Sequence, residues 1–68
     1  MNEKERTLIA NEMLNEVGIE VDPALIVELP TDGATHMMNS WRVFAVRCGE
    51  FTVLAYQFQD EHFRIHLI

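Results

Sequence analysis

The sequence is short of cysteine, of basic residues and of long apolar runs, and each shortage excludes a class of protein. The single cysteine, Cys48, cannot build a disulfide framework or a thiolate metal cluster. Lys and Arg number 5 against 11 Asp and Glu, which leaves too little positive charge for direct nucleic-acid binding. No apolar run approaches the roughly 20 residues that cross a membrane. We expect a cytoplasmic protein without a membrane segment, because the N-terminal residues 1–13 are also unlike a secretion signal.

What the sequence does have is the composition of a globular protein. Hydrophobic residues make up 49% and charged residues 24% of the 68 positions, which separates the chain from disordered proteins. A chain of this length holds one hydrophobic core, so residues 1–68 are predicted to form a single domain. A domain this small buries only about 60% of the surface of its unfolded chain, so association with another molecule would stabilise it.

Residues 2–17 are predicted to form an amphipathic helix. Asn2 followed by Glu5 resembles a capping box, and Gly18 is the expected end of the helix. At about 100° per residue, one arc of the helix is apolar and is the expected core side, formed by Ile9, Ala10, Met13, Leu14 and Val17.

An acidic flank lies beside this arc and is made of Glu5, Glu12 and Glu16, while Leu8 points away from the core. Two interpretations stay open. The acids can simply form a solvated face, on which one exposed leucine is ordinary. Alternatively, Leu8 and the three glutamates are partner-binding residues that contact a basic protein.

The second half of the chain is predicted to form a three-stranded antiparallel meander over residues 41–47, 51–58 and 62–68. Cys48-Gly49 and Asp60-Glu61 are the expected two-residue turns. The predicted fold class is therefore α+β, with the N-terminal helix packed on a small antiparallel sheet. Residues 24–29 form either a fourth strand or a short second helix that begins at Asp22-Pro23.

Pairing across these turns predicts which side chains share a face of the sheet. Val43 then opposes Leu54, and Arg47 opposes Glu50 as an ion pair. The expected core face, under the helix, carries Trp41, Val43, Ala45, Leu54, Tyr56, Phe58, Phe63, Ile65 and Leu67. A slip of one residue at either turn would exchange the two faces of a strand.

The opposite face of the sheet is also apolar, and this is unusual for a face in contact with water. It is expected to carry Phe44, Val46, Phe51, Val53 and Ala55, edged by Arg42, His62, Arg64 and His66. A second helix or another molecule has to cover it. The simplest partner is a second copy in a homodimer packed sheet to sheet, and the predicted partner-binding residues are Phe44, Val46, Phe51, Val53, Arg42 and Arg64.

Patterns typical of catalysis or metal binding are missing from the sequence. His62 and His66 lie about 13 Å apart in an extended strand, too far to share a metal ion. The hydroxyls of Thr31, Thr35 and Ser40 near His36 have no evident orienting partner. We therefore expect no enzyme activity, no metal and no cofactor.

The functional hypothesis is a small non-catalytic protein-binding module, an inhibitor or an adaptor, that self-associates. The alternative is an acidic mimic of nucleic acid that occupies the basic groove of a nucleic-acid-processing complex, as small phage-encoded inhibitors can. That alternative depends on one acidic surface formed by Glu5, Glu12, Glu16, Glu20 and Asp22.

Overall fold

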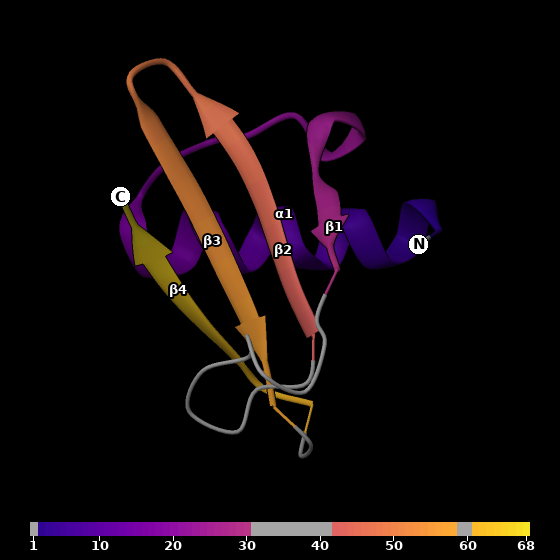
Figure 1. Cartoon of the computed structure of the whole chain (residues 1–68). Coiled ribbons are helices and arrows are strands. Elements are labelled where there is room, and N and C mark those ends of the chain that lie inside the picture. Colours follow the sequence, from indigo (N-terminus) through magenta and orange to yellow (C-terminus); the bar gives the residue numbers. More distant parts are fainter. Residues whose placement is uncertain (1, 31–41, 59–60) are drawn as a thin grey trace.

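The computed structural model describes residues 2–30, 42–58 and 61–68 of the chain. Its elements are α1 (Glu3–Val17), the short 3-10 helix η1 (Pro23–Leu25), β1 (Val27–Leu29), β2 (Arg42–Cys48), β3 (Phe51–Gln57) and β4 (Phe63–Leu67). The strands form one antiparallel sheet in the order β1-β2-β3-β4, and α1 runs across one face of it (Figure 1). The predicted α+β class, one helix packed on a small antiparallel sheet, is confirmed.

The ends of α1 follow the local signals in the sequence. The Oδ1 atom of Asn2 accepts a hydrogen bond of 2.8 Å from the amide of Glu5. Gly18 takes the left-handed conformation, with φ 71°, and its amide donates to the carbonyl of Leu14 at 2.9 Å. A residue with a side chain is strained in that conformation, so the helix ends where glycine permits it.

The apolar arc predicted for α1 is largely correct. Ile9, Ala10 and Met13 are buried, and Val17 packs against the core that they form. Leu14 is 44% exposed and its prediction as a core residue is wrong, because it lies at the margin of the arc. In the described part of the chain no helix has both the length and the apolar character needed to cross a membrane.

Residues 18–30 combine the two alternatives that the sequence left open. The Oδ1 atom of Asp22 caps η1 by accepting from the amide of Ala24 at 3.0 Å. The chain then becomes extended, and Val27 and Leu29 pair with Ala45 and Val43 of β2. The fourth strand is therefore present but shorter than residues 24–29, and it widens the sheet without covering its second face.

The turn between β2 and β3 lies one residue later than predicted. Cys48 pairs with Phe51, so Gly49 and Glu50 form the two-residue loop, and Gly49 supplies a φ of 62°. Each opposed pair shifts by two residues, which leaves every side chain on its predicted face. The expected ion pair with Glu50 is replaced by a hydrogen bond of 3.1 Å from Nε of Arg47 to the carbonyl of Gly49.

The register of β3 and β4 is shifted by a single residue from the predicted one. Relative to β3, each β4 side chain therefore lies on the opposite face of the sheet from the one predicted. The amide of Phe58 donates to the carbonyl of His62 at 3.1 Å, so the loop spans the three residues 59–61. Glu61 has a φ of 70°, as expected at the end of a three-residue hairpin loop. Phe63 therefore pairs with Gln57 and not with Phe58, and the predicted β3–β4 register is wrong.

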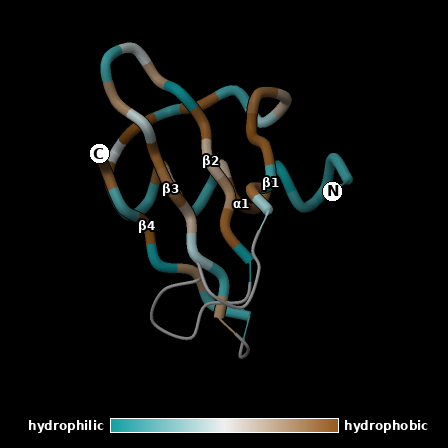
Figure 2. The backbone as a smooth tube through the Cα atoms, viewed as in Figure 1, coloured by the Kyte–Doolittle hydropathy of each residue, from teal (hydrophilic) through white to brown (hydrophobic). Residues whose placement is uncertain are grey.

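The core lies between α1 and the face of the sheet that was expected to be uncovered. Phe44, Val46 and Val53 are 0%, 3% and 0% exposed, so their prediction as partner-binding residues is wrong: α1 itself covers them. Figure 2 shows the hydrophobic stretches of β2 and β3 crossing α1. Phe51 starts β3 on the same face but is 49% exposed. Trp41, expected to share the core face with Val43, lies outside the described residues.

Candidate functional site

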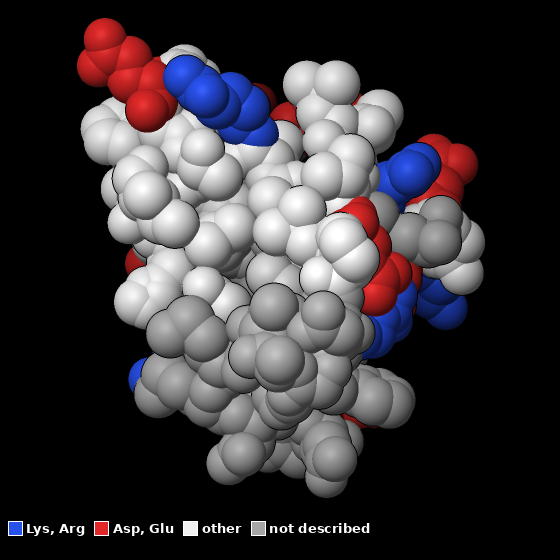
Figure 3. Space-filling model, in the orientation of Figure 1, with Lys and Arg blue, Asp and Glu red and all other residues white. Residues whose placement is uncertain are grey.

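The sheet face that points away from α1 is the candidate docking surface, and we call it the open face. Paired residues share a face, so the register assigns to it Val27, Leu29, Val43, Ala45, Leu54 and Tyr56. Val27 and Leu29 are 53% and 38% exposed, whereas the central Val43 is 8% exposed. No described segment of the chain lies across this face. Figure 3 looks onto it, and the described atoms over its middle are mostly uncharged.

Basic groups border the open face. Arg64 and His66 pair with Tyr56 and Leu54, and Arg47 follows Ala45 by two residues, so all three share this side of the sheet. His66 meets the ring of Tyr56 edge-on, with the centroids 5.8 Å apart. No described strand residue on this side is acidic. The open face is therefore an apolar surface with a basic margin. Arg64 keeps its predicted exposure, but it shares a face with Tyr56 and not with Phe44, because β4 is turned over.

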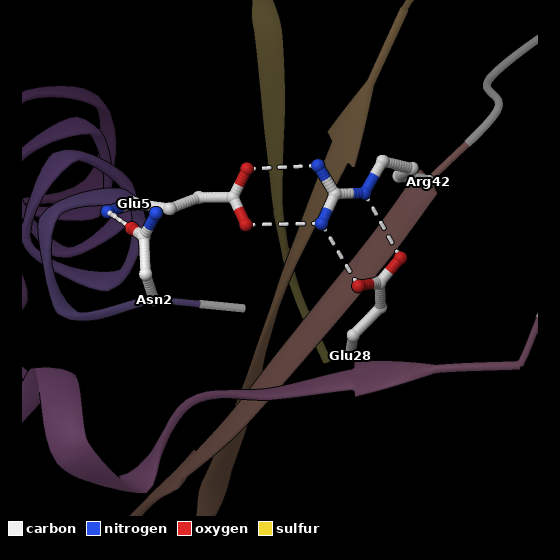
Figure 4. Close-up of polar contacts among 4 residues, drawn as sticks. All are labelled: Asn2, Glu5, Glu28 and Arg42. Carbon is white, nitrogen blue, oxygen red and sulfur yellow. Dashed lines mark hydrogen bonds and ion pairs between the residues drawn. The ribbon is translucent and has the colours of Figure 1, made fainter.

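Arg42 joins α1, β1 and β2 through two carboxylates (Figure 4). Its Nη1 and Nη2 atoms donate to Glu5 at 2.8 and 2.9 Å, and its Nε and Nη2 atoms donate to Glu28, both at 2.9 Å. The guanidinium carbon also lies 4.8 Å from the centre of the Phe44 ring. Arg42 and Glu5 were both predicted to bind a partner. In the structure they bind each other, and their contacts hold the helix against the sheet.

The paired charges change the proton affinities of this cluster. The hydrogen bonds that Arg42 donates to Glu28 and, to a smaller extent, to Glu5 raise the pKa of Arg42, which stays charged. The hydrogen bond from Arg42 lowers the pKa of Glu28 below its ordinary 4.5, against the opposing effect of burial. The Glu28 side chain is 36% exposed, so solvent weakens the pair.

We predict that acid weakens the wild-type protein more than a Glu28→Gln variant. Because the pKa of Glu28 is lowered in the folded state, its stabilising effect is present above pH 4.5 and is lost as the pH falls below that value. Urea unfolding of both proteins between neutral pH and pH 3 would measure this. Equal loss of stability in the two proteins would contradict the assigned pairing.

The acidic flank of α1 is smaller than the sequence indicated. Glu5 is held by Arg42 and Glu12 is half-buried, so Glu16 is the one exposed acid of the three, and Leu8 is 52% exposed. Glu16 and Leu8 remain available to solvent as predicted. The flank no longer forms a continuous row of three free carboxylates.

The described residues offer no arrangement typical of a catalytic or metal site. No three His, Cys, Asp or Glu side chains in residues 2–30, 42–58 and 61–68 come together as metal ligands would. A depression of about 310 Å³ separates α1 from η1, and the described residues around it are Glu3, Arg6, Thr7, Asp22, Pro23 and Ala24. Its charged residues are two acids, Glu3 and Asp22, and one arginine, Arg6. None of the described residues around it is a histidine or a cysteine. The hydroxyls near His36 lie outside the described residues.

The open-face residues Val43, Ala45, Leu54 and Tyr56 were predicted to lie under the helix, and this prediction is wrong because α1 packs on the other face. Sequence reasoning also did not assign Val27 and Leu29 to the docking surface. They flank Glu28, and this alternation of apolar and charged residues is typical of a strand with one exposed face. The signal was weakened by Asp22-Pro23, which also fits the start of a helix, and by the shortness of β1. Comparison with protein-family models, with curated proteins and with solved structures found no match for this chain.

Proposed function

We propose that the protein is a small non-catalytic binding module, an inhibitor or an adaptor, that works in the cytoplasm and docks a protein partner on its open face. The observation that supports this most is the apolar character of a sheet face that no described segment covers. An antiparallel sheet with one face in water normally alternates apolar and polar residues, and the two central strands, β2 and β3, do not. Apolar surface of this kind commonly marks an interface.

The margin of the open face indicates the chemistry of the partner. Arg47, Arg64 and His66 border an apolar centre, and no described acid opposes them on that face. A partner surface with an apolar patch and acidic side chains around it would be complementary. Such complementarity mainly accelerates association and selects the partner, while the apolar contacts supply most of the affinity.

The alternative function, an acidic mimic of nucleic acid, has less support. The contact between Glu5 and Arg42 neutralises one of the five acids on which it depends, and Glu12 is half-buried. A mimic would bind a basic groove through its acids, so added salt would weaken that complex steeply. Docking on the open face predicts a modest dependence on salt.

Two substitutions of almost equal exposure test the proposed docking face. Val27 on the open face is 53% exposed and Leu8 on the outer side of α1 is 52% exposed, so Val27→Glu and Leu8→Glu change the same kind of site on opposite sides of the molecule. Wild-type and variant proteins would capture partners from a lysate of the source organism, followed by mass spectrometry and calorimetry with each purified partner. For a partner that the wild-type protein captures, we expect Val27→Glu to weaken binding about tenfold or more. Leu8→Glu should leave the affinity for the same partner unchanged.

The opposite result would exclude this face. A partner that is lost with Leu8→Glu and kept with Val27→Glu would place docking on the helix. Circular dichroism of both variants shows that the comparison is made between folded proteins.

A further inference from the structure

The outer edge of β4 carries backbone groups that the sheet does not use. Thr52 and Ile68 exchange two hydrogen bonds, of 3.0 and 2.9 Å, and the amide of Phe58 donates to His62. In an antiparallel pair every second residue bonds to the same neighbour. His62, Arg64, His66 and Ile68 therefore face β3 with their backbone groups. The amides and carbonyls that point away from the sheet are those of Phe63, Ile65 and Leu67, and no described segment pairs with them.

The other edge of the sheet is less accessible to a second strand. The same alternation continues through β3 and β2, so Val27 and Leu29 bond to β2 and only Glu28 points its backbone groups outward. β1 has three residues and a charged residue at its centre, and both features protect an edge from further pairing. β4 has five residues in unbroken register and contains no proline. It is the edge that can accept another strand.

We propose that β4 pairs antiparallel with β4 of a second copy, about a twofold axis at Ile65, so that two sheets become one. The sequence of β4 is complementary to itself in this register. On the helix side Ile65 would oppose Ile65 of the second copy, and Phe63 would oppose Leu67 of the second copy, so every pair is apolar. On the other side Arg64 would oppose His66 of the second copy, so no acidic residue enters the paired strands.

Exposure at the β4 edge is consistent with this pairing. Leu67 and Ile68 are 43% and 70% exposed at the end of the strand, and pairing would cover part of both. A single strand edge buries little area, so the dissociation constant of the dimer is expected to be on the order of micromolar or higher. The pairing would place two open faces side by side on one surface. It does not depend on the partner docking proposed above, because a monomer can use the open face equally well.

The pairing is tested by removing one outward amide hydrogen without changing a side chain. The full chain of 68 residues is short enough for chemical synthesis with an N-methyl group on the amide of Ile65. The matched control carries the N-methyl group on Glu28, whose amide points outward at the opposite edge. Sedimentation equilibrium from roughly 10 μM to 1 mM would compare both with the wild-type protein. We expect the wild type to dimerise, N-methyl-Ile65 to dimerise at least tenfold more weakly, and N-methyl-Glu28 to behave as wild type.

Three results would overturn the inference. A wild-type protein that stays monomeric over the whole range has no such dimer. A dimer that tolerates N-methyl-Ile65, or that is weakened equally by N-methyl-Glu28, uses another surface. If the protein is monomeric and only the N-methyl-Ile65 form fails to capture a protein that the wild type captures from the lysate, this edge binds a strand of that different protein. NMR of the wild type gives a second readout, since the amide signals of Phe63, Ile65 and Leu67 should shift with concentration.

Discussion

Replacing Phe44 with alanine is expected to lower the free energy of unfolding by about 3–5 kcal/mol. The Phe44 side chain is fully buried, its ring centre lies 6.3 Å from that of Phe63, and the guanidinium of Arg42 lies over it. A domain of this size has a total stability of roughly 3–10 kcal/mol. Much of the Phe44→Ala protein should therefore be unfolded at room temperature.

Urea unfolding followed by circular dichroism would measure this loss. Phe51→Ala is the matched control, because Phe51 lies on the same side of the sheet but is 49% exposed, and its loss should cost about 1 kcal/mol or less. Phe44→Leu keeps most of the buried volume and should fall between the two. If Phe44→Ala and Phe51→Ala were equally stable, α1 could not lie over Phe44.

The second large effect is expected from Arg42→Met, which should lower the free energy of unfolding by about 1–2 kcal/mol at neutral pH. This substitution leaves the carboxylates of Glu5 and Glu28 without their hydrogen-bond donor. It also removes the cation above Phe44. The Arg42 side chain is 27% exposed, which holds the effect below that of a fully buried ion pair.

Arg64→Met and Arg42→Lys are the controls for this effect. Arg64 is exposed on the open face, so its loss should change stability by roughly 0.5 kcal/mol or less. Lysine at position 42 keeps the charge but lacks the planar fork that contacts both carboxylates, so Arg42→Lys should recover only part of the stability. A loss for Arg42→Met no larger than that for Arg64→Met would show that the ion pairs do not hold α1 to the sheet.

Local features of this fold could be predicted from the sequence, because they depend on a few neighbouring residues. Asn2 caps α1 and Gly18 ends it in the conformation that glycine favours. Asp22 caps the turn that precedes β1. Alternating aromatic and β-branched residues marked the remaining strands, and the α+β class followed from these elements.

The covered face of the sheet could not be predicted, because β2 and β3 are apolar on both sides. Phe44 and Val53 are as hydrophobic as Val43 and Leu54, so the pattern does not show which pair α1 covers. Which face α1 covers therefore had to be inferred from β4, whose apolar side chains move to the other face when the β3–β4 register shifts by one residue. The β3–β4 loop has three residues where the sequence was equally compatible with two.

The Arg42 cluster also has no local pattern. Arg42 lies 37 residues from Glu5 and 14 from Glu28 along the chain, so their meeting depends on the arrangement of α1, β1 and β2. Sequence reasoning placed Arg42 at the rim of an interface because it shares the face of Phe44, which was expected to be uncovered. Its position beside Phe44, on the side that α1 covers, gives it internal partners instead.

The central claim, that α1 covers the Phe44 side of the sheet and that no described segment covers the opposite side, is tested most directly by NMR distance measurements. Nuclear Overhauser effects between the methyl group of Met13 and the side chains of Phe44 and Val53 are the predicted result. Effects from Met13 to Leu54 and Tyr56 would place the helix on the other face and contradict the account.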